Sequence, residues 1–347
     1  MQNDDIEVGG CTDSFALLAC RMRKPVLVLV VPFVFTLSVT AQTLLVANQG
    51  DHTVSVVDAD SAKQVAVIDE GVPGQWGHEL ATSPDGKTAY VPIYGNSGVG
   101  QPGIDGREML VIDIASRKVT GRVDFGSGVR PHCVVYDPNS KLLYVTAELA
   151  KSVAVVDPRT LKVVGNIPTG AAESHMLALS HDGKRGYTAN VASGTVSVLD
   201  IPGRKTVTVI PVAGRVQRIS ISKDDKSVFT SDQSKPELVV IDTATNKVKS
   251  RVALPAVGYG TASTADGRSL LVTLPSINKV GVVDLGTLKL TRTIDVCKAP
   301  PEIIIPGQIA YVSCARDRHV AAIDTGSWKV LSMIEVGNGD DGLAWAK

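Results

Sequence analysis

A short segment that ends in aspartate recurs seven times in this chain of 347 residues, and it constrains the fold more than any other feature. Each copy is an apolar, largely β-branched run closed by Asp58, Asp113, Asp157, Asp200, Asp242, Asp284 or Asp324. The intervals between the copies are 55, 44, 43, 42, 42 and 40 residues. A repeat of this length with four strand signals in each unit is typical of the blades of a β-propeller.

One unit shows how the repeat would fold. From Ser174, HMLALS predicts a first strand and RGYTAN a second, with the turn HDGK between them. TVSVLD and KTVTVIPV predict the third and fourth strands. The Asp-Gly pair favours a tight turn because glycine adopts positive φ at little cost. We expect the aspartate that ends each third strand to cap the next turn through its carboxylate, which is a structural role.

The two ends of the repeat array predict how the ring closes. The first repeat begins with a second-type strand, Thr43 to Asn48, and the chain ends with DDGLAWAK, which matches the first-strand pattern. Gly342 to Lys347 should therefore complete the first blade. The prediction is an all-β protein over residues 42–347, a seven-bladed propeller of four-stranded antiparallel blades without an open edge.

The first 41 residues have the composition of a targeting segment. A basic start at Met22 is followed by an uncharged apolar run over residues 25–39 and by small residues up to Ala41. This pattern predicts a secretory signal peptide over residues 22–41, cleaved before Gln42, and makes residues 1–21 an over-extended N-terminus. We expect a periplasmic or secreted protein that keeps no membrane span after cleavage.

Composition and missing motifs narrow the function classes. The chain has 35 Lys and Arg against 35 Asp and Glu, and only 4% of its residues are aromatic. This balance gives no strong signal for binding nucleic acid or an anionic membrane. The sequence has no CxxCH, GxSxG or HExxH motif, so the signatures of covalent haem, α/β-hydrolases and zincins are missing. We expect a monomer.

The repeat resembles the YVTN family of seven-bladed β-propellers, exported bacterial and archaeal proteins related to surface-layer and lactonase-like propellers. The resemblance is carried by LYVTAELAKSVAVVDPRTLKVVGNIPTG (143–170), by GYTANVASGTVSVLD and by ELATSPDGKTAYV, and it covers residues 43–347. The YVTN tetrapeptide itself does not occur intact. The resemblance implies the fold. Because such propellers serve many functions, it implies no single activity.

The start positions of the innermost strands predict where a site would form. Loops from neighbouring blades surround one mouth of a propeller's central channel, where ligands usually bind. In blade order from two to seven and then one, these positions are His78, His132, His175, Gln217, Tyr259, Glu302 (or Pro301) and Asp341. Three converging imidazoles are a ligand set for one divalent metal, zinc or copper. The alternatives are a non-metal ligand or acid–base role, and a purely structural role.

Other side chains of the same face are candidates for ligand binding. They are Trp76, Glu79, Arg130, Glu148, Glu173, Arg215, Gln217, Arg218 and Tyr259. The three arginines would bind a carboxylate or phosphate as bidentate forks, or would pair with Glu148 or Glu173. Trp76 would stack on a ligand or cover the channel.

An insertion and three cysteines complete the list of candidates. Blade two carries YGNSGVGQPGIDGRE from Tyr94 to Glu108, which we interpret as a lid beside His78. Cys297 and Cys314 end strands of adjacent blades on one face, so we predict a disulfide between them. Cys133 follows His132 and is either a buried thiol or a soft metal ligand.

Two functional hypotheses follow. The first is an exported binding protein whose mouth holds a metal or an unidentified small molecule or protein partner. The alternative is a propeller enzyme, a metal-dependent hydrolase or lyase or an oxidoreductase, that uses His78, His132 and His175. The sequence does not decide between them, and it names no cofactor or substrate.

Overall fold

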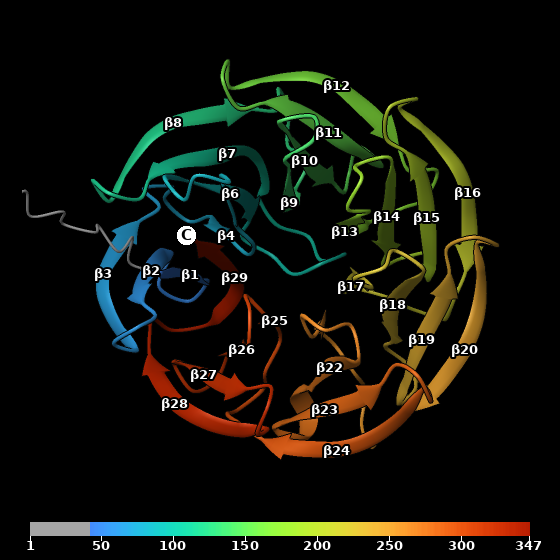
Figure 1. Cartoon of the computed structure of the whole chain (residues 1–347). Helices are drawn as coiled ribbons and strands as arrows, with labels where there is room; N and C mark the ends of the chain where they lie inside the picture. Colours follow the sequence, from blue (N-terminus) through green and yellow to red (C-terminus); the bar gives the residue numbers. More distant parts are fainter. Residues whose placement is uncertain (1–41) are drawn as a thin grey trace, which may run out of the picture. The chain divides into compact units, whose positions relative to one another are not determined.

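Seven antiparallel sheets are arranged in a ring around a central axis (Figure 1). The computed structural model describes residues 42–347, so the predicted signal peptide and the over-extended N-terminus lie outside the described residues. Six sheets have four strands. The sheet of blade two has five because its innermost strand is split in two. The predicted all-β, seven-bladed propeller is confirmed.

Every blade repeats the same order of strands from the axis outward. The innermost strands are β29 (Asp340–Ala346), β4 (Trp76–Gly77) with β5 (Ala81–Thr82), β9 (Pro131–Asp137), β13 (Ser174–Leu179), β17 (Ile219–Ile221), β21 (Thr261–Ser263) and β25 (Ile303–Ile304). The second strands are β1 (Thr43–Asn48), β6 (Thr88–Gly95), β10 (Leu142–Ala147), β14 (Arg185–Asn190), β18 (Ser227–Asp232), β22 (Ser269–Leu274) and β26 (Ile309–Cys314).

The outer half of each blade is as regular as the inner half. The third strands are β2 (Thr53–Asp58), β7 (Asp105–Asp113), β11 (Ser152–Asp157), β15 (Thr195–Asp200), β19 (Glu237–Asp242), β23 (Lys279–Asp284) and β27 (His319–Asp324). The outermost strands are β3 (Lys63–Asp69), β8 (Lys118–Asp124), β12 (Lys162–Pro168), β16 (Lys205–Pro211), β20 (Lys247–Ala253), β24 (Lys289–Asp295) and β28 (Lys329–Glu335). A short 3-10 helix, η1 (Pro275–Ile277), follows β22.

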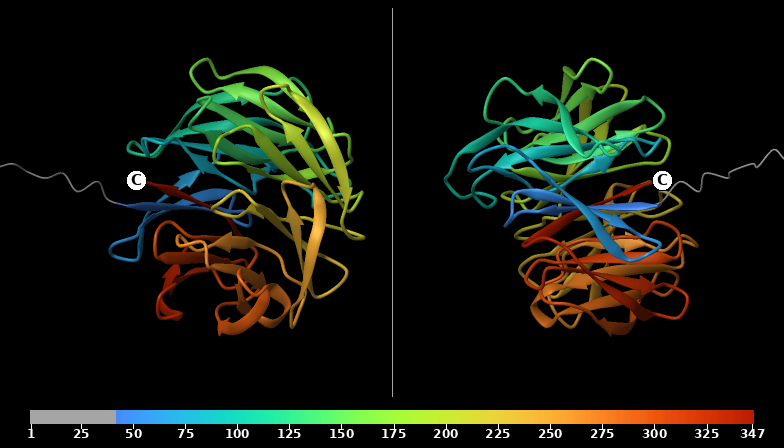
Figure 2. Two further views of the ribbon diagram at one scale, coloured as in Figure 1. Left: turned by 45° about the vertical axis from the view of Figure 1, so that its right-hand side comes forward. Right: turned by 90° about the vertical axis from the view of Figure 1, so that its left-hand side faces the viewer.

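The ring closes through the two ends of the propeller. β29 pairs antiparallel with β1, with Thr43 opposite Ala346 and Val46 opposite Leu343. Figure 2 shows these first and last strands together. The C-terminal strand is thus the innermost strand of blade one, as predicted, and it begins at Asp340, two residues earlier than expected. Pairing both ends in one sheet leaves no inner edge open.

The hydrophobic core lies between the blades. Second and third strands are buried on both faces, as in β11, because each sheet is covered by the blade on either side. Outermost strands alternate instead, and in β12 only Ile167 is fully buried. This difference in burial explains why the second and third strands are continuous apolar runs, whereas the outermost strands have a mixed composition.

The aspartates that end the third strands cap the following turns. Asp58 Oδ1 accepts hydrogen bonds from the Ser61 amide and hydroxyl, both at 2.8 Å. Asp113 makes the same contacts with Ser116. These hydrogen bonds lower the pKa of the Asp58 carboxyl. The repeated aspartate therefore serves the fold rather than a reaction.

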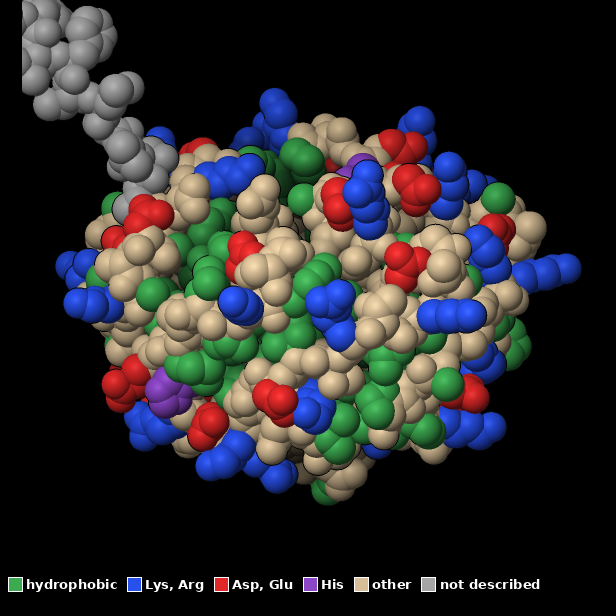
Figure 3. Space-filling view, turned by 60° about the horizontal axis from the view of Figure 1, so that its bottom comes forward, with side chains coloured by type: hydrophobic (Ala, Val, Ile, Leu, Met, Phe, Trp, Pro, Cys, Tyr) green, Lys and Arg blue, Asp and Glu red, His purple; other side chains and the backbone are tan. Residues whose placement is uncertain are grey.

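The surface has no dominant charge on the face seen in Figure 3, where basic and acidic side chains are interspersed with apolar ones. Within residues 42–347, we find no helix of the length and hydropathy needed to cross a bilayer.

Candidate functional site at the axial mouth

The start positions of the innermost strands meet around one mouth, in the predicted register. The His78 and His132 rings lie with centroids 5.2 Å apart, and those of His132 and His175 lie 3.6 Å apart. Nε2 of His175 is 3.4 Å from Nε2 of Gln217. His78 Nδ1 is 3.9 Å from Asp341 Oδ2 and so continues the circle on its other side. The mouth divides into two chemically different halves.

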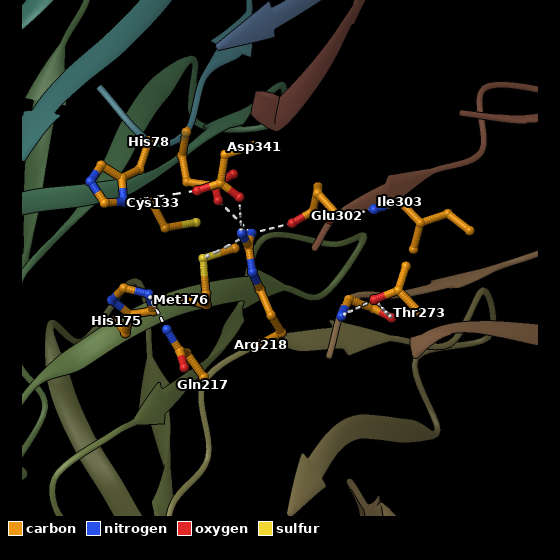
Figure 4. Close-up of polar contacts among 12 residues, drawn as sticks. His78, Cys133, His175, Met176, Gln217, Arg218, Thr273, Glu302, Ile303 and Asp341 are labelled. Atoms are coloured by element: carbon orange, nitrogen blue, oxygen red, sulfur yellow. Dashed lines mark hydrogen bonds and ion pairs between the residues drawn. The ribbon is translucent and has the colours of Figure 1, made fainter. Parts of the chain in front are cut away.

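The first half is an ion cluster around Arg218, drawn in Figure 4. Its Nη1 donates to Glu79 and to Glu302, and its Nη2 donates to Asp341 Oδ1 at 2.7 Å. The Tyr259 ring lies 5.3 Å from its Cζ. The four charged side chains come from blades two, five, seven and one, so they join opposite sides of the channel. We call these five residues the acid half.

Burial controls the charge of the acid half. Arg218 is 3% exposed and faces three carboxylates. Burial raises the pKa of Glu79 well above its ordinary range, although the Arg218 charge opposes this shift, and it raises that of Glu302 for the same reasons. Burial disfavours the charged form of Arg218, but the surrounding carboxylates outweigh it and raise its pKa. The guanidinium therefore stays charged, and the glutamates hold protons more readily than exposed ones.

The second half, which we call the histidine half, contains His78, His132, His175, Glu148 and Tyr94. Glu148 Oε1 pairs with His175 Nδ1, and Glu148 Oε2 accepts a hydrogen bond of 2.8 Å from the Tyr94 hydroxyl. Both side chains of the Glu148–His175 pair are almost fully buried. A carboxylate bound to one ring nitrogen fixes the orientation of the imidazole and the tautomer that it adopts.

Tyr94 is the functional residue that the sequence analysis missed. Its ring centroid lies 4.7 Å from that of His78, 5.3 Å from His132 and 6.4 Å from His175. It was assigned to the insertion of blade two, but β6 continues through it to Gly95. The alternation in TAYVPIYG runs past the expected strand end and could have revealed this.

The two other imidazoles of the histidine half are neutral. Burial lowers the pKa of His78 to about 4 and lowers that of His132 well below its ordinary value. His78 Nε2 and His132 Nδ1 are buried and have no hydrogen-bond partner. An unpaired buried polar atom costs about 1–3 kcal/mol. These two nitrogens are therefore the atoms of the histidine half that remain available for a hydrogen bond or a metal ion.

The predicted metal centre is not preformed. In residues 42–347, no group of three or more His, Cys, Asp or Glu side chains has metal-binding geometry. The planes of the His132 and His175 rings are tilted by only 32° and the rings face each other. Cys133 directs its sulfur to the Leu177 carbonyl, and burial raises its pKa to about 12, as expected of an inert thiol. The three-histidine metal site stays a prediction.

The insertion of blade two lies against blades three and four. Its outer parts extend β6 and β7, which pair Gly95 with Asp105, and leave a loop at residues 96–104. Arg130 donates to the Gln101 carbonyl at 2.7 Å. A Cβ placed on Gly100 would lie 3.1 Å from a carboxylate oxygen of Glu173. The loop thus contacts the segments that lead to His132 and His175, while the start of the insertion lies beside His78, through the Tyr94 ring and the pairing of Gly95 with Trp76. Its role as a lid stays a prediction.

Several predicted ligand-binding residues have other partners. Arg130 pairs with Asp105, and Arg218 pairs with the carboxylates of the acid half. Neither arginine therefore pairs with Glu148 or Glu173, which was one of the predicted alternatives. The reason is that His175 and Tyr94 already occupy Glu148. Trp76 stacks on His52 with ring centroids 5.0 Å apart, and its role toward a ligand or the channel stays a prediction. Arg215 is exposed, and its carbonyl accepts from the Gln233 amide.

A cavity of about 490 Å³ opens over the acid half. It is lined by Gln49, Gln233, Val257, Tyr259, Pro275, Ser276, Pro301, Ala315, Arg316, Gly339 and Asp341. Glu302, and not its neighbour Pro301, reaches Arg218, which resolves the alternative left by the sequence. Cys297 and Cys314 form a disulfide with their Cα atoms 5.5 Å apart, and it anchors the blade-seven loop that carries Ala315 and Arg316.

Comparison with known proteins supports the fold and the repeat type. No family model matches the sequence. Two curated proteins, both described as uncharacterized protein YncE, from Salmonella typhi and Salmonella typhimurium, are 26% identical over 217 residues. The match spans 60% of this chain and only 60% of the length of those relatives. The chain is a seven-bladed β-propeller, and its repeats are similar to those of these relatives.

Solved structures of similar fold are named for different activities. A chain of Kuenenia stuttgartiensis hydrazine synthase superposes on this propeller with a TM-score of 0.71 at 20% identity, covering 82% of this chain and 92% of that one. The periplasmic gluconolactonase PpgL of Pseudomonas aeruginosa gives 0.68 at 18%, covering 89% and 99%. The dihydro-heme d1 dehydrogenase NirN gives 0.62 at 15%, covering 87% and 74%. At these identities the likeness shows the fold alone.

Proposed function

We propose that this YVTN-type propeller is an exported protein that binds a small molecule in the cavity over the acid half. One observation carries the proposal: a cavity of about 490 Å³ opens onto a buried ion cluster built by four separate blades. Sites for small molecules commonly have volumes of about 300–1,000 Å³ with a few placed polar groups.

A purely structural role does not account for this cluster. Buried ion pairs contribute little net stability compared with apolar side chains of the same size. The channel floor carries Arg218 and three carboxylates where apolar packing would hold the blades equally well. Charged groups kept buried beside a cavity are characteristic of binding and catalytic sites.

Blocking the cavity tests the proposal. Ser276 lines the cavity from η1, so Ser276→Trp would fill it without removing a member of the acid half. The control is Ser193→Trp, in an exposed loop of blade four that does not line the cavity. We expect some members of a library of polar metabolites to raise the melting temperature of the wild type and of the control, but not of Ser276→Trp. If no member does so, or if Ser276→Trp responds equally, the proposal fails.

Export is tested separately. The proposal uses the predicted signal peptide, and the likeness to a periplasmic propeller supports it. Expression of the full chain in a bacterial host, followed by fractionation and N-terminal sequencing, should find a mature protein that begins at Gln42 outside the inner membrane. Intact chain that retains residues 22–41 in the cytoplasm would contradict export.

The histidine half supports a second candidate function, an enzyme. The observation in its favour is the Glu148–His175 pair beside two neutral imidazoles with unpaired nitrogens. A carboxylate-oriented imidazole can act as a general base, and neutral imidazoles are suitable ligands for zinc or copper.

Elemental analysis of untagged protein tests the metal form of this candidate. The test variant replaces His78, His132 and His175 with alanine. The control replaces the other three histidines, His52, His181 and His319. Stoichiometric zinc or copper that only the test variant loses supports the enzyme. Absence of metal from the wild type after reconstitution contradicts its metal-dependent form.

A further inference from the structure

We infer that the ligand of the acid half is a small amine that also carries an oxygen acceptor, as a free amino acid does. This inference rests on the proposed function of the cavity and adds the chemical class of its ligand. Three separate features carry it: the charge balance at the cavity floor, the unpaired donor of Arg218 and the composition of the rim.

The ion cluster that meets the cavity at Asp341 has more carboxyl groups than cations. One guanidinium is shared by three carboxylates, those of Glu79, Glu302 and Asp341. The side chains of Asp341 and Glu302 are 13% and 12% exposed, while that of Arg218 is 3% exposed. A ligand therefore reaches the carboxylates before the arginine. Since three carboxyl groups share one guanidinium, an ammonium group beside them would supply a second cation to the cluster.

The same geometry disfavours an anionic group at the floor. Three of the five N–H bonds of the Arg218 guanidinium already donate to carboxylates, so its two terminal nitrogens offer no unoccupied fork to a phosphate or carboxylate. An anion placed there would also compete with these three carboxyl groups for the one guanidinium. The interpretation of Arg218 as an anion-binding fork is thus unsuited to this arrangement.

Three buried nitrogens of the mouth lack partners, those of Arg218, His78 and His132. Nε of Arg218 is a donor inside the acid half, and Arg218 as a whole is 97% buried. Nε2 of His78, whose other ring nitrogen faces Asp341, is the second. A buried donor without a partner is costly, so the arrangement favours a ligand that brings an oxygen acceptor along with its ammonium.

The rim supplies groups for the rest of such a ligand. Tyr259 lines the cavity, and an aromatic face next to carboxylates suits a cation. Arg316 lines the cavity from the loop of blade seven that the disulfide anchors. Its side chain is exposed and forms no ion pair among the residues that the structure describes. It is positioned to attract a carboxylate near the mouth. An amino acid carries both charges that these two regions select.

Calorimetric titration with defined probes tests the inference. The wild-type propeller is titrated with each of the twenty free L-amino acids and with the N-acetyl derivative of every one that binds. Acetylation removes the ammonium charge but keeps the side chain and the carboxylate. We expect at least one amino acid to bind and its acetylated form to bind at least tenfold more weakly.

Variants identify the groups responsible. Asp341→Asn keeps the shape of the side chain and should weaken binding by about tenfold or more. Glu237→Gln, which alters an exposed carboxylate of blade five paired with Arg251, should not. Arg316→Gln changes only the exposed rim and should weaken an amino acid more than the matching amino alcohol.

The outcomes separate the two proposals. Equal binding of the acetylated form, or full affinity in Asp341→Asn, overturns the ligand class. If the library yields ligands that Ser276→Trp abolishes and none of them is an amine, the inference fails while the proposed function stands. If nothing binds in a manner sensitive to Ser276→Trp, both fail.

Discussion

The two halves of the mouth occupy equivalent positions of the same repeat, yet they differ in almost every chemical property. In the histidine half, neutral rings and the Glu148–His175 pair are buried against the insertion of blade two. In the acid half, Arg218 pairs with three carboxylates, and Asp341 and Tyr259 of this half line a cavity. The propeller therefore fixes where side chains converge, and the individual residues decide whether that place is neutral or charged. Geometric equivalence does not imply chemical equivalence.

Removing the charge of Arg218 should produce the largest effect. Arg218→Met leaves three buried carboxylates without their cation, and breaking a buried ion pair in this way costs about 3–5 kcal/mol. We expect a loss of this size in the free energy of unfolding at pH 7.5, measured by chemical denaturation. The control, Arg159→Met, removes an exposed guanidinium that pairs with Asp157 at the surface end of a strand and should change stability less. Equal losses would show that the acid half is not buried as described.

The cavity over the acid half is lined by a loop that a disulfide anchors, the one between Cys297 and Cys314. The disulfide joins residues 17 apart, and closing a loop of this size stabilises a protein by about 3 kcal/mol. The double variant Cys297→Ala/Cys314→Ala should lower the free energy of unfolding by about that amount. Cys133→Ala, which removes a buried thiol from the other side of the mouth, should cost less. A larger loss in Cys133→Ala would reverse the comparison.

Breaking the Glu148–His175 pair should lower the free energy of unfolding less than removing Arg218 does, because one charged contact is lost and not three. Glu148→Gln removes the charge but keeps a side chain that can still accept from Tyr94. We expect a loss of about 1–3 kcal/mol, the cost of a buried hydrogen bond to a charged group. Glu173→Gln on the next loop is the matched control and should be nearly neutral. A loss as large as that of Arg218→Met would contradict the ranking.

Acid should destabilise the histidine half by the smallest amount. The pKa of His78 falls to about 4 in the folded protein, against about 6.5 in the unfolded chain, so its contribution to stability is present above pH 6.5 and is lost as pH falls toward 4. The sign is the same for His132, whose pKa is also lowered. At pH 5.5 the loss for His78 would be about 1.4 kcal/mol.

Two other buried carboxyls oppose this loss. Burial raises the pKa of Glu70 and of Asp340 to about 7, so both favour folding as pH falls below 7. The useful measurement is therefore the difference between the wild type and His132→Asn in how the free energy of unfolding changes with pH. The variant should lose less stability between pH 6.5 and 5. An identical pH dependence would mean that His132 is not held neutral by burial.

Sequence reasoning predicted the ring and the register of the mouth because both depend on strand periodicity. His78, His132 and His175 share one phase of their strands, and the structure keeps them adjacent. Strand periodicity could not predict which side chains meet across the channel. Arg218 is 139 residues from Glu79 and 84 from Glu302, and their pairing depends on side-chain reach and strand tilt, which leave no local pattern.

The insertion shows a second kind of limit. A glycine-rich polar stretch predicts a loop, and its central residues 96–104 do form one. Its ends, however, extend β6 and β7, and this extension puts Tyr94 among the three imidazoles. Where strands continue into an insertion is decided by pairing with the neighbouring strand, because the flanking composition suits either state.

The division of the mouth into a buried neutral half and an open charged half is tested most directly by nitrogen NMR of the imidazole rings. The protein is labelled with ¹⁵N-histidine, and resonances are assigned with His78→Asn and His132→Asn. At pH 5.5 both rings should give the spectrum of a neutral imidazole. If both rings are protonated at that pH, the histidine half is open to water and the account of two unlike halves is wrong.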